Sequence, residues 1–362
     1  MALPLPLISV TGTPAECGAA YGAATAALVG ANVDLYLQRF RDQAGLDATA
    51  VRISGAAFRR SAHELLPRVA AMLDGVAEGA GANAEELYAI NGRTELIYGS
   101  RRDGGCTSAG VLGTHTATGT LLLGQNWDWH PAQREAMVVL ATRDERGLAV
   151  ITLAEAGMLA KAGLNSAGLG VCLNMLGTDR DGPREGVVPY HVLLRAVLET
   201  DHLGAATRVA CRTPRGASLN LLLGQAAAGG GEILDLEVVP GDVGWLHPVD
   251  GYVTHANHLE TPLPVRDRAK DFGGSSFFRG ARARRLLADA VAARKVTEDD
   301  FIALFRDHGG FPMSICRHVD ERDEPVERAE TVYSVLLDLD RRRFGIAAGP
   351  PCQHEYAFTS LE

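Results

Sequence analysis

The sequence has few lysines, no long apolar run and no excess of positive charge, and each shortage excludes a class of protein. Lysine occurs only at Lys161, Lys270 and Lys295, and the formal net charge of the 362 residues is −9. Nucleic-acid-binding proteins need concentrated positive charge. A membrane-spanning helix needs about 18 consecutive apolar residues, and no run approaches that length. We therefore expect neither a nucleic-acid nor a membrane partner.

The cysteines lack the spacing of a disulfide framework or a zinc site, because none of them forms a Cys-x-x-Cys pair. The six positions are Cys17, Cys106, Cys172, Cys211, Cys316 and Cys352. Residues 1–7 also lack the basic region and the long apolar core of a signal peptide. We expect reduced thiols, no metal or other cofactor, and a cytoplasmic location.

What the chain does contain is a helical first third, predicted over residues 13–100. Residues 13–16 combine a capping threonine, a proline at the first helical position and a glutamate, which is typical of a helix start. A second helical region covers about 48–79, where Pro67 breaks or restarts the helix. A third, short helix begins at 83–86.

After residue 105 the pattern changes to short apolar segments separated by turns, which predicts strands. Strands are expected at 120–124, 136–142, 148–153, 170–173, 217–223, 232–239, 243–246, 251–253, 332–338 and 344–347. Helices are expected at about 189–199, 279–293 and 298–307. Helices and strands come in runs instead of alternating strictly, so the pattern favours an α+β fold over a doubly wound parallel sheet.

Cys106 is the first candidate for chemistry, because it follows the glycine pair Gly104-Gly105 at the boundary between the two halves. Attack of its thiol on the carbonyl of Gly105 would give a thioester, and hydrolysis would free the Cys106 amine. An α-amino group has a pKa of about 7.7–8.0, which suits a general base near neutral pH. The plain alternative is a structural cysteine in a turn.

Two further polar segments could serve such a nucleophile. Asp128 lies in Asn126–His130, where a carboxylate could orient an N-terminal ammonium, or where a strand simply ends. The segment Thr254–His258 offers Asn257, whose side-chain N–H would suit an oxyanion hole. Its two histidines could alternatively be ordinary loop residues or, less favourably, metal ligands.

Two arginines near the C-terminus, Arg317 and Arg328, are surface charges by default. A buried arginine aimed at the nucleophile would instead bind a carboxylate or a backbone carbonyl. The glycine-rich segment 163–170 lacks the spacing of a dinucleotide-binding loop, so it predicts no nucleotide site.

Taken in order, these segments resemble the acyl-coenzyme A:6-aminopenicillanic acid acyltransferase (isopenicillin N acyltransferase) family of N-terminal-nucleophile hydrolases. Each motif alone is modest, but six in the same order are specific. They are Asn91–Leu96, Asp103–Thr107, Gln125–Asp128, Glu155–Gly157 with Gly163–Gly168, Thr254–His258, and Ser314–Arg317.

The resemblance implies an αββα sandwich of the N-terminal-nucleophile type, with a helical N-terminal segment. It implies self-cleavage between Gly105 and Cys106 into a leader of residues 1–105 and a catalytic chain of residues 106–362, which stay together. Cys106 becomes the nucleophile, and Asn257 becomes an oxyanion donor. Asp128 partners the Cys106 amine, and Arg328 lines the site.

Two departures from the family pattern stand beside this resemblance. The chain has two glycines before the cysteine where the family carries one. It also has Glu327 where the penicillin-pathway acyltransferase has a serine, which weakens any inference of a penicillin precursor as substrate.

The predicted function is therefore that of a self-processing hydrolase of linear amide bonds in small N-acyl compounds. The first alternative is an acyltransferase that moves an acyl group from acyl-CoA or an amide to an amine. A non-catalytic binding protein of the same fold is the second, and a metal-dependent hydrolase using His255 and His258 is the most distant. The expected partners are a small-molecule amide, the chain's own cleaved fragment and, as an open option, a second copy of the chain.

Overall fold

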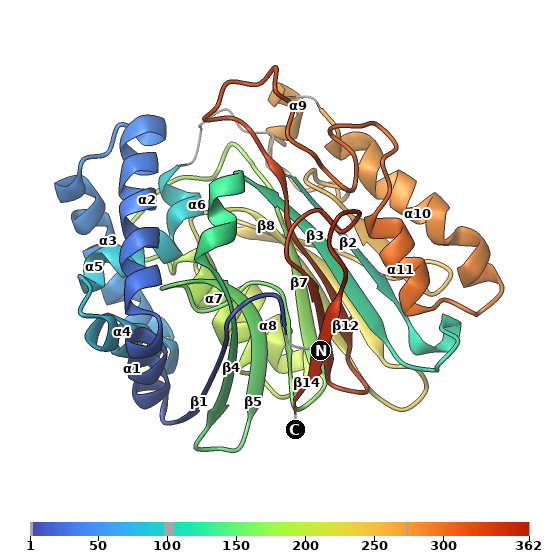
Figure 1. Ribbon diagram of the computed structural model, residues 1–362, viewed down its shortest axis with the longest axis horizontal. Coiled ribbons are helices and arrows are strands. Elements are labelled where there is room, and N and C mark those ends of the chain that lie inside the picture. The colour runs from blue at the N-terminus through green and yellow to red at the C-terminus, as the bar shows by residue number, and fades with distance from the viewer. Residues whose placement is uncertain (1–2, 98–104, 273, 362) are drawn as a thin grey trace.

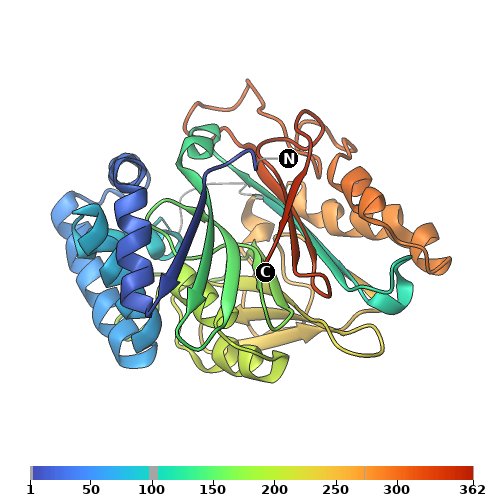
Figure 2. The ribbon, with the colours of Figure 1, turned by 60° about the horizontal axis from the view of Figure 1, so that its bottom comes forward.

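The computed structural model describes residues 3–97, 105–272 and 274–361 (Figure 1). Two β-sheets pack face to face, and helices cover their outer sides (Figures 1 and 2). The larger sheet has the strand order β1-β4-β5-β6-β7-β8-β9-β10, and the smaller has the order β11-β2-β3-β12-β13-β14. The predicted α+β class and the αββα layering are both confirmed.

The strands of the larger sheet are β1 (Leu7–Gly12), β4 (Met137–Asp144), β5 (Ala149–Glu155), β6 (Gly163–Asn165), β7 (Leu169–Met175), β8 (Leu219–Gln225), β9 (Glu232–Val239) and β10 (Asp242–Leu246). Those of the smaller sheet are β11 (Tyr252–His255), β2 (Gly105–Val111), β3 (Leu122–Trp129), β12 (Glu330–Asp338), β13 (Arg343–Ala347) and β14 (Ala357–Ser360). In the larger sheet β1 runs parallel to β4, so the N-terminal segment is part of that sheet.

Helices on the side of the larger sheet are α1 (Pro14–Ala24), α2 (Ala26–Ala44), α3 (Ala48–Leu65), α4 (Pro67–Ala80), α5 (Ala84–Asn91), α6 (Arg93–Leu96), α7 (Tyr190–Leu198) and α8 (Leu203–Arg212). Helices α10 (Ser276–Ala292) and α11 (Glu298–Phe305) cover the outer face of the smaller sheet, and α9 (Ala269–Phe272) precedes them (Figure 1). In the described part of the chain, no helix combines the length and apolarity that a membrane crossing requires.

Helices α1 and α4 pack with their backbones in contact, because glycines lie where they cross. A Cβ on Gly18 would lie 1.9 Å from the carbonyl oxygen of Met72, and one on Gly75 would lie 2.3 Å from that of Ala15. No side chain fits at either position. The glycines therefore set how closely the helical layer is assembled.

The predicted helix starts are confirmed. Thr13 and Glu16 form a capping box at α1, and Pro67 opens α4. Strands β1, β2, β6 and β14 and helices α8 and α9 were not predicted. Strand β2 is buried at every position, between α10 on one side and β7 on the other, so it shows no polar alternation. Strand β3 also runs further than expected, to Trp129, and takes in the predicted polar motif.

Candidate active site

Cys106 is the second residue of β2, and its thiol is buried, with 4% of the residue exposed. Its backbone N–H donates to Asn257 Oδ1 at 2.7 Å. Its carbonyl oxygen accepts a hydrogen bond from Arg279 Nη1 at 2.5 Å. Both polar backbone groups of this cysteine are therefore held by side chains from the segments that follow β11.

Asn257 is fixed in one orientation by its neighbours. Its Oδ1 accepts from the Cys106 N–H and from Arg279 Nη2 at 2.8 Å, while its Nδ2 donates to the Met175 carbonyl at 2.9 Å. Two donors on one side and an acceptor on the other assign the amide oxygen and nitrogen. In this arrangement the side-chain oxygen of Asn257 faces the backbone nitrogen of Cys106 and accepts its hydrogen bond.

Asp128 faces the residue before the cysteine, because Gly105 and Asp128 pair across β2 and β3. Its Oδ1 accepts a hydrogen bond from Thr331 Oγ1 at 2.7 Å. A Cβ on Gly105 would lie 2.2 Å from Asp128 Oδ2, so only glycine fits beside this carboxylate. The other glycine of the pair, Gly104, and Asp103 before it lie outside the described residues.

The environment of the Cys106 thiol favours its protonated form. Burial raises its pKa, and the negative charge of Asp128 raises it further. A hydrogen bond from the Met175 N–H and the charge of Arg279 act in the opposite direction but do not outweigh them. The thiol therefore needs a base before it can act as a nucleophile.

The two predicted C-terminal arginines lie in different surroundings. Arg328 donates to the carbonyls of Asp323 and Glu321 in its own loop, at 3.3 and 3.2 Å. Arg317 is buried, and its backbone N–H donates to Thr331 Oγ1 at 2.9 Å. The structure thus brings Cys106, Asn257 and Asp128 together, but it gives Arg328 no described contact with them.

The arginine that does reach Cys106 is Arg279, which the sequence analysis did not single out. It is only 1% exposed and lies in the first turn of α10. Other buried residues of this helix follow at Ala283, Leu287 and Val291, each four positions further on. A charged residue that begins such an apolar stripe is the sequence pattern that could have identified it.

A small enclosed cavity of about 20 Å³ lies against Cys106, which is room for about one water molecule. Its walls are mainly aromatic and cationic: Arg93, Thr94, Cys106, Trp127, Trp129, Lys161, Leu173, Met175, Tyr190, His191 and Tyr333. Arg93 lies 4.3 Å from the Trp129 ring centre, and Lys161 Nζ lies 3.7 Å from that of Trp127.

Glu155 balances the charge beneath this cavity. Its Oε1 lies 2.7 Å from Lys161 Nζ and 3.3 Å from Arg93, and its Oε2 accepts from the Tyr36 hydroxyl at 2.5 Å. Burial would raise the pKa of Glu155, but the charges of Lys161 and Arg93 lower it. Burial also lowers the pKa of Lys161 to about 7, although the negative charge of Glu155 acts to raise it.

The two histidines of the Thr254–His258 motif have separate partners. His255 is buried, with Nε2 3.0 Å from Glu237 Oε1 and Nδ1 2.9 Å from the Ala256 carbonyl. His258 Nδ1 lies 2.9 Å from Ser276 Oγ. The group of His, Cys, Asp or Glu ligand atoms found close together in the described residues lies elsewhere, and neither of these histidines belongs to it.

The family model of acyl-coenzyme A:6-aminopenicillanic acid acyl-transferase matches residues 115–353, well over half of the chain. The chain belongs to this family. The matched range begins after Cys106 and contains Asp128, Asn257, Arg279 and Arg328. The predicted enzyme class, amide hydrolase or acyltransferase, agrees with this membership.

Among curated proteins, this acyltransferase-family chain is similar to the acyl-coenzyme A:6-aminopenicillanic-acid-acyltransferase 40 kDa form of Emericella nidulans. The two are 28% identical over 361 residues, which cover 97% of this chain and 94% of the relative.

Two solved structures are more distantly similar to this acyltransferase-family chain. A mutant conjugated bile acid hydrolase from Clostridium perfringens has 11% identity and a TM-score of 0.45, covering 70% of this chain and 97% of its own. Penicillin V acylase from Agrobacterium tumefaciens has 13% identity and a TM-score of 0.43, covering 67% and 83%.

Proposed function

We propose that this chain is a self-processing cysteine amidohydrolase that acts on linear amides of small N-acyl compounds through a thioester on Cys106. The observation that carries this proposal is the contact between the Cys106 N–H and Asn257 Oδ1. A side chain, held in turn by Arg279, already binds the nitrogen that self-cleavage would turn into a free amine. Strand β11 ends at His255, opposite Ser108, so a side chain and not a neighbouring strand holds the nitrogen of Cys106.

In the processing step, Cys106 Sγ attacks the carbonyl carbon of Gly105 while the Asp128 carboxylate takes the thiol proton. The C–N bond breaks, and the proton passes to the nitrogen of Cys106, leaving Gly105 as a thioester on sulfur. Water then hydrolyses the thioester to the Gly105 carboxylate and the free thiol of Cys106, whose α-amine was already released when the C–N bond broke. The close contact of Asp128 with Gly105 supports this assignment.

In turnover, the free Cys106 amine accepts the thiol proton, and the thiolate attacks the substrate's amide carbonyl. Asn257 Nδ2 has two hydrogens; one bonds the Met175 carbonyl, and the other donates to the oxyanion. The N–H of Met175, which contacts the thiol, is the proposed backbone donor. The amine returns its proton to the leaving group, and water resolves the acyl-enzyme. For the arginine of the site we propose Arg279 in place of Arg328.

The same thioester could be resolved by an incoming amine, which would make the chain an acyltransferase. The curated relative is named as an acyltransferase that uses acyl-coenzyme A, and that activity is the second candidate here. Hydrolysis and transfer are separated by the products formed from one acyl donor with and without a competing amine.

The cytoplasmic location and the homo-oligomer stay predictions.

We further propose that the fragments 1–105 and 106–362 remain associated after cleavage. Strand β1 lies in the larger sheet beside β4, and Arg93 is buried against Glu155. These contacts join the two fragments through a sheet edge and a buried ion pair. Separating the two fragments would expose the edge of β4 and the charges of the ion pair to water.

The test is the intact mass of purified protein, with Cys106→Ala as the inactive variant and Cys211→Ala as the matched control. The wild type and Cys211→Ala should yield two masses that break between Gly105 and Cys106, and they should elute as one species under native conditions. Cys106→Ala should stay a single chain with no amide hydrolysis. A wild-type chain that stays intact and inert after long incubation would instead support the non-catalytic binding protein.

A further inference from the structure

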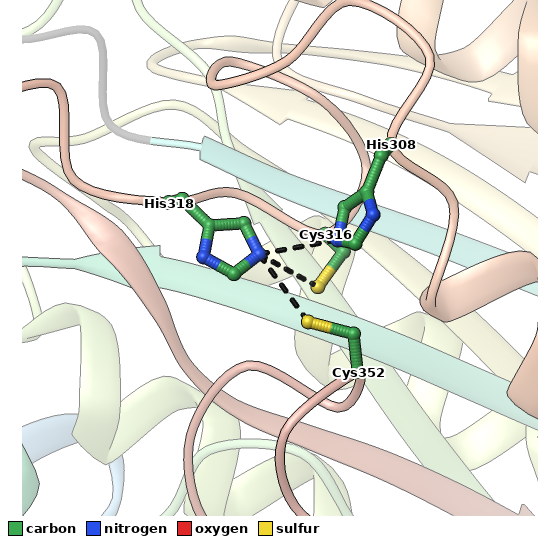
Figure 3. Close-up of side chains that lie close together, drawn as sticks. All are labelled: His308, Cys316, His318 and Cys352. Atoms are coloured by element: carbon green, nitrogen blue, oxygen red, sulfur yellow. Dashed lines mark hydrogen bonds between the residues drawn. The ribbon is translucent and has the colours of Figure 1, made fainter.

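A second group of reactive side chains lies apart from Cys106, on the loop that follows α11 and on the turn between β13 and β14 (Figure 3). The group consists of His308, Cys316, His318 and Cys352, and one ligand atom from each lies within 4.8 Å of all the others. Cys316 is buried, His318 and Cys352 are half-buried, and His308 is exposed. An ion could therefore enter from the side of His308.

The three distances from His318 to the other members fit a tetrahedral zinc ion. His318 Nε2 lies 3.1 Å from His308 Nε2, 3.7 Å from Cys316 Sγ and 3.3 Å from Cys352 Sγ. Bonds of about 2.3 Å to sulfur and about 2.0–2.1 Å to nitrogen, at tetrahedral angles, require about 3.4 Å between nitrogens and about 3.6 Å between nitrogen and sulfur. Each observed separation agrees to within about 0.3 Å.

Hydrogen bonding alone does not account for this convergence. One ring nitrogen of His318 faces three heteroatoms, yet an imidazole nitrogen has a single lone pair or a single hydrogen in the plane of the ring. Four potential donors of electron pairs within 4.8 Å of one another are the usual surroundings of a metal ion. Two sulfurs and two imidazoles favour zinc over magnesium or calcium, which prefer oxygen ligands.

We propose that His308, Cys316, His318 and Cys352 form a structural zinc site. Four protein ligands leave no open position for water or substrate, so the ion would stabilise the fold and take no part in catalysis. Binding would release the thiol protons of Cys316 and Cys352 as both become thiolates. This inference does not depend on the proposed function of Cys106.

The site would anchor a loop that lies behind the candidate active site. Asn126 Nδ2 donates to the Ile315 carbonyl at 2.8 Å, and the Thr331 N–H donates to the Arg317 carbonyl at 3.0 Å. Thr331 is also the residue whose hydroxyl donates to Asp128. A metal that links Cys352 to this loop would therefore also stabilise the contacts that position Thr331 and, through it, Asp128.

The first experiment measures zinc bound to the full chain, produced without a metal-binding tag, by mass spectrometry of the elements. We expect about one zinc ion per wild-type chain. Because losing even an outer-shell partner weakens metal binding about 10–100-fold, Cys352→Ser and His308→Ala should lose at least about tenfold in zinc affinity. Cys211→Ser and His202→Ala, at a half-buried cysteine and an exposed histidine, are the matched controls.

A second measurement needs only the wild type, so it holds even where a variant does not fold. Cobalt added to metal-free protein should give the intense visible absorption of a tetrahedral thiolate site, and zinc should protect Cys316 and Cys352 from alkylation. Three results would overturn the proposal. The first is no uptake of zinc or cobalt, and the second is equal uptake by Cys352→Ser. The third is an intact mass lower by two hydrogens, which would show that Cys316 and Cys352 form a disulfide.

Discussion

At the scale of single residues, the guanidinium of Arg279 connects the parts of the candidate active site. Besides its bonds to Cys106 and Asn257, it donates through Nη1 to Thr107 Oγ1 at 2.8 Å and through Nε to Ser275 Oγ at 2.9 Å. A planar guanidinium offers five donors in a fixed fork, whereas an ammonium group acts as a single point. No other side chain could make these four bonds from one position.

Replacing Arg279 should therefore separate its role from that of Arg328. Arg279→Lys should slow self-cleavage and amide hydrolysis by about 100-fold or more, because losing one well-placed donor at such a site costs about that much. Arg328→Lys should stay within about twofold of the wild type, since its bonds go to its own loop. Rates from the time course of intact mass decide the matter. Full activity in Arg279→Lys with loss in Arg328→Lys would restore the original assignment.

The sequence singled out three of the four residues that the structure brings together here, but not Arg279. Cys106, Asp128 and Asn257 lie in short motifs whose order along the chain is distinctive. Arg279 stands alone at the start of a helix, and only its burial on an apolar face gives it meaning. Burial is a tertiary property, so no local motif marks it.

The candidate zinc site was not expected from the cysteine spacing, because its residues also meet only in the folded chain. Its only local element is the pair Cys316 and His318, two positions apart. His308 and Cys352 join them only because the C-terminal turn folds back onto the loop that follows α11. Sequence spacing predicts sites formed by one segment and misses those formed by two.

At the scale of elements, the helical layer depends on the crossing of α1 and α4. Gly18 and Gly75 allow the two backbones to touch, so a methyl group at either position would have to push the helices apart. Close packing makes interiors intolerant of added volume. This contact helps to hold the N-terminal segment against the rest of the chain.

We expect Gly18→Ala to lower the free energy of unfolding by about 1–3 kcal/mol, the usual cost of overpacking. The matched control is Gly30→Ala in α2, where the space beyond the Cα is open and alanine should stabilise the helix by up to about 1 kcal/mol. Urea denaturation of each variant gives the comparison. Equal stability of the two variants would mean that α1 and α4 are further apart than described.

Which elements could be predicted depended on their surroundings. Helices α1 and α4 were recognisable from their first residues, because Thr13 caps α1 and Pro67 opens α4. Strand β2 consists mostly of small residues and is covered on both faces, so it lacks the alternation that identifies a strand. Helix α8 buries only Ala206 and Ala210, a face too weakly apolar to stand out.

At the scale of the whole molecule, a buried ionic contact joins the two sheets. His255 at the end of β11 belongs to the smaller sheet, and its partner Glu237 in β9 belongs to the larger. Burial alone would lower the pKa of His255, but the charge of Asp235 and the hydrogen bond to Glu237 raise it to about 9. Both ring nitrogens face oxygen acceptors, which fits a doubly protonated ring.

This contact predicts a pH dependence of stability. Because the pKa of His255 is higher in the folded state than its ordinary 6.5, the stabilisation it gives is complete below about pH 6.5. It should be lost as the pH rises through about 9. Other buried groups titrate nearby, so urea midpoints at pH 6 and pH 9 should be compared between wild type, His255→Gln and the exposed control His202→Gln. A decline just as steep in His255→Gln would exclude this origin.

The parallel pairing of β1 with β4 affects the order of folding and cleavage, and it affects how refolding depends on protein concentration. The two strands come from opposite sides of the Gly105–Cys106 bond, so the sheet is completed by one chain before cleavage and by two pieces afterwards. Folding of the intact chain is independent of dilution, whereas reassembly of denatured, cleaved protein would require an encounter between the pieces. If the bond is cut as proposed, the molecule must fold first and be cut second, and dilute refolding of the mature form should fail where that of Cys106→Ala succeeds.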